Sequence, residues 1–221
     1  MCGRYGFIPT DFYNRFSIDN RIDRLETHYN VSPGMMMPVI TRNSPNKAEL
    51  MRWGLIPFWA KDPRIGYKMI NARAEDIQFK PSFRKPIRSQ RCLVPTSGFF
   101  EWKHVGEEKI PYFIKLKGSD MFAFAGLYDI WKDVEEYPLK SFTIITTSPN
   151  SLVESIHNRM PVILDEKFED IWLDNTITDV NKVVALLKPY DSSQMEAYPV
   201  SMLINNPAND LPEVVKPESK K

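Results

Sequence analysis

The sequence predicts a single α+β domain, with a curled, mostly antiparallel β-sheet, a barrel-like core and flanking short helices. The chain has 221 residues, 43% of them hydrophobic, which is enough to fill one substantial core. Segments rich in β-branched and aromatic residues follow one another closely between residues 91 and 147, as in a strand-rich fold. Eighteen prolines against nine glycines favour many short segments over long helices.

The N-terminal half predicts few regular elements. Thr10 is a good N-cap, and apolar Phe12 and Phe16 follow it at helical spacing, so a short helix is expected there. The other elements expected in this half are strands at 38–41 and 49–53, a polar turn at 43–46 between them, and a helical turn at 71–77.

The C-terminal half predicts most of the sheet. The expected strands are 92–94, 98–102, 112–117, 121–131, 141–147, 161–164 and 196–201, and the expected helices are 152–157, 168–173 and 180–187. Residues 1–204 are expected to form one domain. The polar, proline-containing and lysine-ended stretch 205–221 is expected to be a loose tail.

Composition excludes several classes of protein. No apolar run approaches the roughly 18–20 residues of a membrane helix, and charged residues begin at Arg4, so we expect neither a membrane protein nor a signal peptide. Two cysteines make no disulfide framework, which favours a cytoplasmic protein. Phosphate-loop, dinucleotide and metal-ligand spacings are absent, so neither a cofactor nor a metal site is expected.

Charge is segregated along the chain. The net charge of +1 divides into +8 over residues 1–104 and −7 over residues 105–221. Residues 52–91 hold ten basic and three acidic side chains, with six aromatic side chains among them. Cations that neutralise phosphates and rings that stack on bases suit single-stranded nucleic acid. The alternative is an ion-paired surface over a core that contains the aromatic side chains.

Position 2 carries the most informative residue. If Met1 is removed, Cys2 becomes the N-terminus and carries a 1,2-aminothiol. Its α-amine, with a pKa of about 7.7–8, is partly neutral at physiological pH and can condense with an aldehyde. The adjacent thiol then closes the imine to a five-membered thiazolidine. The alternative is a cysteine placed next to the start codon by chance.

Three other residues are candidates for proton transfer or orientation. Glu101 lies inside an apolar strand, where a carboxylate is costly unless it is used or paired, although an edge-strand glutamate facing water is equally compatible with the pattern. His157 follows a predicted helix just before Pro161, where a capping or packing role is the alternative. Asn71 can orient a polar group and Arg73 can bind phosphate, or they form a helix N-cap and a surface charge.

An ordered set of short motifs resembles the SOS response-associated peptidase (SRAP) family of abasic-site processing proteins, over roughly residues 2–203. The matching stretches are Met1-Cys-Gly-Arg4, Tyr29-Asn-Val-Ser-Pro-Gly34, Arg52-Trp-Gly-Leu-Ile-Pro57 with Trp59, Ile70-Asn-Ala-Arg-Ala-Glu75, Arg91-Cys-Leu-Val-Pro95, Gly98-Phe-Phe-Glu-Trp-Lys103, Phe124-Ala-Gly-Leu-Tyr-Asp129, Ile145-Thr-Thr147 and His157-Asn-Arg-Met-Pro161.

The resemblance implies a reaction and a partner. Proteins of this family link their N-terminal cysteine covalently to the ring-opened aldehyde of an abasic site in single-stranded DNA, in the DNA damage response. The implied activity is lyase-like cross-linking, and "peptidase" refers to self-removal of Met1. A monomer acting in the cytoplasm, on the nucleoid when bound to DNA, is expected.

The resemblance also assigns roles to residues. Cys2 is the implied nucleophile, Asn71 holds the amine and the sugar, Glu101 takes protons from the amine, and His157 protonates the ring oxygen and later reverses the link. The implied DNA-binding residues are Arg4, Pro33, Gly34, Trp59, Arg73, Arg84 and Arg159, with Trp59 as a wedge beside the lesion. Whether Lys80 or Arg84 contacts a phosphate stays open.

The chain departs from many relatives at one implied DNA contact, because Phe58-Trp59 stands where they have two tryptophans. Two other functions remain open from the residues alone. One is an N-terminal-nucleophile or cysteine peptidase that uses Cys2 with His157. The other is a non-catalytic single-stranded DNA-binding module built on residues 52–91.

Overall fold

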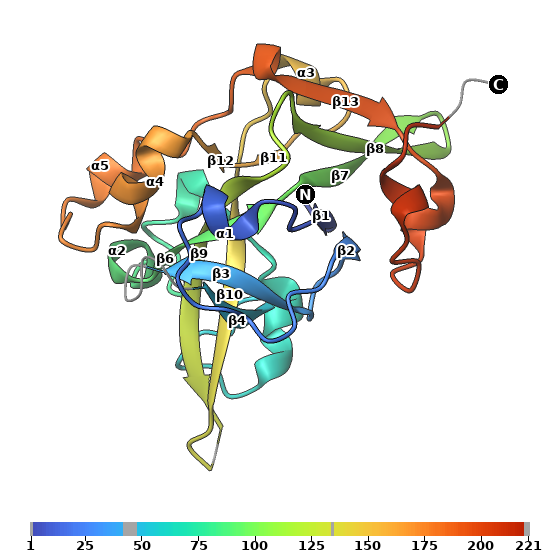
Figure 1. Cartoon of the computed structure of the whole chain (residues 1–221). Helices are drawn as coiled ribbons and strands as arrows, with labels where there is room; N and C mark the ends of the chain where they lie inside the picture. Colours follow the sequence, from blue (N-terminus) through green and yellow to red (C-terminus); the bar gives the residue numbers. More distant parts are fainter. Residues whose placement is uncertain (1, 42–47, 134, 219–221) are drawn as a thin grey trace.

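A computed structural model describes residues 2–41, 48–133 and 135–218 (Figure 1). Within them the strands are β1 (Tyr5–Phe7), β2 (His28–Val31), β3 (Met36–Thr41), β4 (Ala48–Trp53), β5 (Asn71–Arg73), β6 (Arg91–Thr96), β7 (Gly98–Val105), β8 (Glu108–Leu116), β9 (Phe122–Lys132), β10 (Pro138–Thr147), β11 (Met160–Pro161), β12 (Ile163–Leu164) and β13 (Met195–Pro199). The α-helices are α1 (Phe12–Arg15), α2 (Pro86–Ser89), α3 (Ser151–Glu154), α4 (Glu166–Leu173) and α5 (Val180–Val184).

The core of the fold is a five-stranded barrel. The strands pair in the order β10-β4-β3-β6-β9, and β9 pairs with β10 to close the ring. All of these pairings are antiparallel except β4–β10, which is parallel. The predicted α+β domain with a mostly antiparallel, barrel-like core and short helices is therefore confirmed.

A second sheet, in the order β13-β8-β7-β1-β2, packs beside the barrel. The chain passes from β6 of the barrel to β7 of this sheet across a sharp corner at Ser97. Only glycine fits after that corner, because a Cβ at Gly98 would lie 2.3 Å from Cζ of Phe113. In Figure 1 the helices α4 and α5 flank the barrel on one side, and the C-terminal segment lies on the other.

One predicted element was wrong. Residues 71–77 were expected to form a helical turn, but Asn71–Arg73 is strand β5, which pairs in parallel with Ile144–Thr146 of β10. Only Ala74–Asp76 forms a 3₁₀ turn. Pairing with a neighbouring strand outweighs the local preference here. The polar turn expected at 43–46 lies outside the described residues.

The segment after Asn205, expected to be loose, is attached to the body as far as it is described. Val214 is fully buried in a small cluster with Phe100 and Phe113. Asp210 accepts hydrogen bonds from the backbone N–H groups of Tyr29 and Asn30, over 2.5 and 3.0 Å. Val214 and Asp210 thus attach this segment to distant strands, although its composition alone predicts a loose tail.

Candidate functional site

The first part of the site is the N-terminal stretch leading into β1. Antiparallel pairing of β1 with β7 continues upstream, where Phe100 N–H donates to the Arg4 carbonyl over 3.1 Å. This pairing brings Cys2 next to Glu101 on β7. The Cys2 side chain is fully buried, with Sγ 3.7 Å from the Arg4 carbonyl oxygen.

Asn71, on β5, reaches the same point from the barrel. Its Nδ2 donates to the Cys2 carbonyl over 2.9 Å. The preceding residue, Ile70, is fixed because its carbonyl accepts a 3.0 Å hydrogen bond from Trp53 Nε1. The Asn71 Oδ1 atom is buried and accepts no hydrogen bond from the described residues. Asn71 Oδ1 is therefore a hydrogen-bond acceptor that lies close to the Cys2 backbone.

His157 enters from the loop after α3, which Asn150 caps by accepting a hydrogen bond from Val153 N–H. His157 Nε2 lies 3.8 Å from Glu101 Oε2. Its Nδ1 lies 3.1 Å from the Arg159 backbone nitrogen, which can only donate. The same Nδ1 lies 3.3 Å from the Arg159 carbonyl oxygen, so the contacts at Nδ1 are compatible with either neutral tautomer, and Nε2 is the ring nitrogen that faces Glu101.

Burial governs the electrostatics of this cluster. It raises the pKa of Glu101 to about 7 and lowers the pKa of His157. It also raises the pKa of the Cys2 thiol, which the nearby Glu101 carboxylate raises further. Burial therefore disfavours the charged form on both sides of the 3.8 Å contact between Glu101 and His157.

The four residues predicted to act together, Cys2, Asn71, Glu101 and His157, converge on one point. They come from two sheets and a loop, far apart in the sequence, and they are joined by the contacts given above. The edge-strand reading of Glu101 is wrong, because the residue is only 2% exposed. The helix N-cap reading of Asn71 is also wrong, because Asn71 begins a strand.

The predicted DNA-binding arginines differ in their surroundings. Arg73 and Arg84 are exposed. Arg4 is partly buried, its Nη1 donates to the Gly3 carbonyl over 2.9 Å, and burial lowers its pKa. Arg159 forms a bidentate pair with Glu75, over 2.5 and 2.9 Å, so its guanidinium is already held by a carboxylate.

Glu75 is a residue that the sequence analysis missed. Its pair with Arg159 joins the strand that carries Asn71 to the loop that carries His157, and the hydrogen bond from Arg159 Nη2 to the Thr146 carbonyl fastens both to β10. Glu75 is exposed, and the hydrogen bond from Arg159 lowers the pKa of its carboxyl group. The sequence signal was only the place of Glu75 at the end of the Ile70–Glu75 motif, because its 3₁₀ turn and its pairing with Arg159 are visible in the structure alone.

Trp59, the predicted wedge, is 47% exposed on a loop whose backbone is held at three points. Side chains of β9 and β10 make the three contacts, namely Ser141 Oγ with Ile56 N–H at 2.7 Å, Asp129 Oδ2 with Phe58 N–H at 2.9 Å, and Trp131 Nε1 with the Ala60 carbonyl at 2.7 Å. The backbone around Trp59 is therefore already held in place without a ligand. The sequence analysis did not identify Asp129 as its support.

The predicted turn at Pro33 and Gly34 connects β2 to β3. Gly34 has φ of +95°, in the left-handed region that favours glycine. Its N–H donates to the Trp53 carbonyl over 2.8 Å, which ties the turn to the end of β4. The turn and Trp59 thus both extend from the same end of the barrel sheet.

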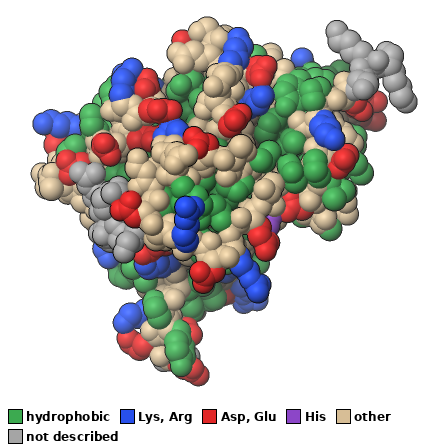
Figure 2. Space-filling model, viewed as in Figure 1, with side chains coloured by type: hydrophobic (Ala, Val, Ile, Leu, Met, Phe, Trp, Pro, Cys, Tyr) green, Lys and Arg blue, Asp and Glu red, His purple; other side chains and the backbone are tan. Residues whose placement is uncertain are grey.

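The basic and aromatic residues of segment 52–91 divide between surface and core. Phe58, Trp59, Tyr67 and Phe79 are exposed, whereas Trp53 and Phe83 are buried. Arg91 is fully buried, and its guanidinium donates only to backbone carbonyls, those of Ile87, Arg88, Trp172 and Asp174. It closes the C-terminal ends of α2 and α4, so counting it toward a nucleic-acid surface was wrong. Figure 2 shows one face of the molecule, on which basic and acidic side chains are interspersed.

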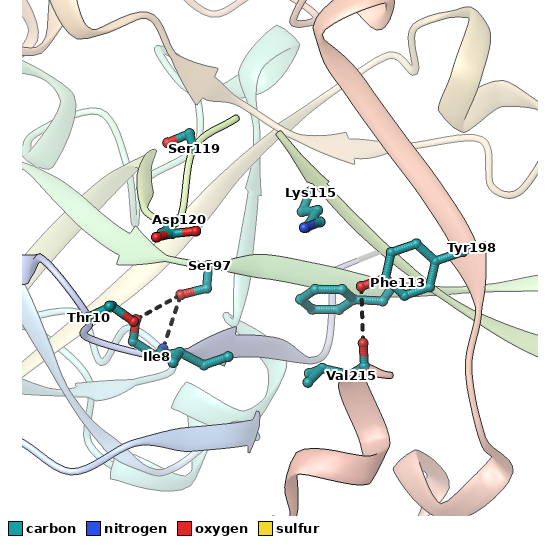
Figure 3. Close-up of a pocket in the computed structure, with 9 residues that line it drawn as sticks. All are labelled: Ile8, Thr10, Ser97, Phe113, Lys115, Ser119, Asp120, Tyr198 and Val215. Carbon is teal, nitrogen blue, oxygen red and sulfur yellow. Dashed lines mark hydrogen bonds between the residues drawn. The ribbon is translucent and has the colours of Figure 1, made fainter. Parts of the chain in front are cut away.

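A cavity of about 240 Å³ lies apart from this cluster, between β8, the C-terminal segment and the start of α1 (Figure 3). Two of its polar side chains make structural hydrogen bonds. Ser97 Oγ bonds the Ile8 backbone, and Tyr198 Oη donates to the Val215 carbonyl over 3.0 Å. Cys2, Asn71, Glu101 and His157 do not line it.

The part of the chain that the structure describes contains no group of three or more His, Cys, Asp or Glu side chains placed to hold a metal ion. Among the same residues no helix is long and apolar enough to cross a membrane.

Comparisons with known proteins give consistent results. The family model described as SOS response associated peptidase (SRAP) matches residues 1–207. A Bacillus subtilis (strain 168) protein named abasic site processing protein YoqW is 50% identical over 222 residues, which cover 98% of this chain and 99% of that protein. Abasic site processing protein HMCES of Gallus gallus is 33% identical, over 76% of this chain and 56% of that protein. A crystal structure of a protein from Bacteroides thetaiotaomicron matches with a TM-score of 0.91 at 34% identity, over 99% of this chain and 100% of that one.

Proposed function

Because this chain belongs to the SOS response associated peptidase family, we propose that it processes abasic sites by linking Cys2 covalently to the lesion in single-stranded DNA. Removal of Met1, by the protein itself or by an aminopeptidase, gives Cys2 a free amine. The protein needs no cofactor for this reaction and acts as a monomer in the cytoplasm, on the nucleoid when bound to DNA.

The reaction joins both nucleophiles of Cys2 to one aldehyde carbon. An abasic deoxyribose is mostly a closed hemiacetal, so the ring must open before the amine can attack. The amine then adds to the aldehyde, one water leaves as the imine forms, and the thiol adds across the C=N bond to give a thiazolidine. The second step is intramolecular and has a large effective molarity, so the ring is favoured over the open imine.

The buried cluster supplies the proton transfers. Glu101, with its pKa raised to about 7, accepts a proton from the amine and can release it again at neutral pH. His157 donates a proton to the ring oxygen, and its lowered pKa makes the imidazolium form a stronger acid. Asn71 holds the Cys2 backbone through Nδ2, and its Oδ1 is available to the new amine.

Binding residues surround this cluster. Arg73 and Arg84 contact phosphates, Arg4 lies beside the reacting residue, and Pro33 and Gly34 lie near the Trp59 wedge, where the DNA is kinked beside the lesion. Arg159 acts mainly by holding the His157 loop through Glu75, since its guanidinium is already paired. An intact nucleotide must unstack its base to enter a pocket, which costs a few kcal/mol. An abasic sugar has no base to unstack and enters without this cost.

The observation that carries the proposal is the convergence of Cys2, Asn71, Glu101 and His157 at a single buried point. A surface that only bound DNA would not require a buried carboxylate with a raised pKa beside a buried cysteine.

The test uses the second cysteine as a matched control. Protein whose loss of Met1 is verified by mass spectrometry is incubated with an oligonucleotide carrying one abasic site and separated under denaturing conditions. Wild type and Cys92→Ala should give a shifted, heat-stable band, and Cys2→Ala and Cys2→Ser should give none. No shift with correctly processed wild type, or a shift with Cys2→Ala, would overturn the proposal.

The same variants separate the two other functions. A cysteine peptidase commonly keeps partial activity with a serine nucleophile, whereas Cys2→Ser cannot close a thiazolidine. A DNA-binding module predicts equal binding by wild type and Cys2→Ala, with no covalent product from either.

A further inference from the structure

We propose that Tyr67, with the Arg52 guanidinium stacked on one face, is a binding platform for an intact base that neighbours the lesion. The inference rests on the proposed function and extends it, because Tyr67 belongs to none of the motifs assigned to DNA binding. It concerns the nucleotides flanking the abasic site rather than the site itself.

The ring of Tyr67 is exposed but held from two sides. Solvent reaches 59% of the residue, and the Arg52 guanidinium carbon lies 4.9 Å from the ring centroid, over one face. A Cβ built on Gly34 would lie 3.4 Å from Cε1 and 3.6 Å from Oη, but 3.9 Å from Cζ, the carbon between them. The two outer atoms are nearer than the atom that joins them, so Gly34 meets the edge of the ring. Neither contact covers the face opposite Arg52, and 59% of the residue is exposed, so we take that face as the stacking surface.

The segment that carries Tyr67 is fixed to the barrel. It is the 3₁₀ helix η1 (Pro63–Lys68), capped at its start by the Asp62 side chain. Its other end packs backbone to backbone against the residue after β4, because a Cβ on Gly66 would lie 2.6 Å from the Gly54 carbonyl oxygen. The ring is thus placed before a ligand arrives, and stacking on it costs little ordering entropy.

Charge favours a nucleotide as the occupant. Among the described residues, no carboxylate lies within 4 Å of the Arg52 guanidinium, so its positive charge is left for an external anion. An aromatic face next to an unneutralised cation fits a base and its phosphate. The contact with Gly34 puts this platform beside the turn expected to lie against the DNA strand.

An intact base is required, because an abasic sugar offers no flat face to stack. The platform should therefore increase affinity for DNA in general rather than discriminate the lesion, which the Cys2 cluster does. Stacking of a single base on an aromatic side chain makes a substantial contribution to affinity for single strands, and it tolerates any base because every base has a flat face.

Non-covalent affinity measures this contact without the cross-linking step. In a Cys2→Ser background, binding to a single-stranded oligonucleotide with one tetrahydrofuran abasic analogue is followed by fluorescence anisotropy. Tyr67→Leu should weaken binding by about tenfold, as expected for the loss of one base stack. Tyr67→Phe keeps the ring face and should bind as its parent does. Tyr137→Leu is the matched control, an exposed tyrosine outside the basic segment, and should also leave the affinity unchanged.

Removing the flanking bases tests whether the affinity attributed to Tyr67 depends on a base. In further oligonucleotides, the nucleotide on one side or the other of the lesion is also replaced by tetrahydrofuran. One of these replacements should erase the difference in affinity between the Tyr67→Leu variant and its parent, because the base that stacks on the ring is then missing.

Two outcomes contradict the proposal. One is equal binding by Tyr67→Leu and its parent on the base-containing oligonucleotide. The other is a loss of affinity that persists when both flanks are base-free, since that loss reports altered folding. Failure of the cross-linking proposal is read separately, from denaturing gels of the protein that retains Cys2.

Discussion

Burial of Glu101 has opposite consequences for chemistry and for stability. A carboxyl with a pKa near 7 can exchange protons at neutral pH, which a solvated glutamate with a pKa near 4.5 does poorly. The same burial means that the folded protein binds this proton more tightly than the unfolded chain does. Stability contributed by Glu101 is therefore full at low pH and falls as the pH rises from about 4.5 to about 7.

Glu101→Gln should accordingly stabilise the protein while it slows cross-linking. Above pH 7 the variant should exceed wild type in free energy of unfolding by up to about 3 kcal/mol, and below pH 4.5 the two should converge. Urea denaturation at about pH 4, 6 and 8 measures this, with the exposed carboxylate variant Glu135→Gln as the control. A difference independent of pH would show that ionisation of Glu101 is not its source.

Three arginines illustrate how the same residue type takes different roles. Arg91 and Arg159 both belong to motifs with a basic character, yet the structure turns both guanidinium groups toward protein acceptors. Arg73, by contrast, is exposed. Partners decide these roles, and the partners come from other parts of the chain.

Among the secondary-structure elements and their connections, the loop between β4 and η1 shows how a buried side chain, Asp129, positions an exposed one, Trp59. Asp129 is 2% exposed, and its carboxylate accepts hydrogen bonds from Phe58 N–H, Gln90 Nε2 and its own neighbour Ile130 N–H. Trp131 and Ser141 hold the same loop on either side. Strands β9 and β10 thus fix the position of Trp59.

Asp129→Ala should loosen the wedge without touching the reactive cluster. Loss of a buried acceptor for Phe58 N–H should lower the free energy of unfolding by about 1–3 kcal/mol. Cross-linking to abasic DNA should slow, whereas the reaction of Cys2 with a small free aldehyde should keep its rate. Glu135→Ala, at the exposed end of the same hairpin, is the control. Equal loss toward DNA and small aldehyde would show that Asp129 supports the whole fold instead of the loop.

For the molecule as a unit, the C-terminal segment packs against the second sheet. Asn30 Nδ2 donates to the carbonyls of Asn206 and Asn209, and the Asp210 carboxylate contacts His28 Nδ1 over 2.7 Å. These contacts hold β2, and β2 leads directly into the turn at Gly34. The end of the chain therefore helps to place a part of the candidate DNA surface.

Removing residues 205–221 should destabilise the protein. Exposing the site of Val214 and leaving the Tyr29 and Asn30 N–H groups without Asp210 should cost at least about 3 kcal/mol in free energy of unfolding. Urea unfolding of a chain ending at residue 204 measures the loss, and a chain ending at residue 218 is the control. If both chains unfold at the same urea concentration, the segment contributes nothing to the fold.

The fold was predictable in kind because its signals are local. Strand runs such as 98–102 and 141–147 carry enough β-branched and aromatic residues to identify them, and short helices follow from cap residues such as Asn150. Strand β5 was missed because three residues hold no periodicity, and only the neighbouring β10 makes them a strand. The C-terminal segment was missed for a similar reason, since its few apolar residues become significant only against Phe100 and Phe113.

Residue type and order were enough to predict the class of fold and the family, both of which are confirmed, and to name four residues as candidates for the chemistry. Only the folded chain shows which charged side chains are paired, how deeply Glu101 is buried, which segments Glu75 and Asp129 hold, and that Tyr67 is exposed beside Arg52. These properties depend on distances between residues far apart in the chain. Burial and pairing, which set pKa values and exposure, exist only once those residues meet.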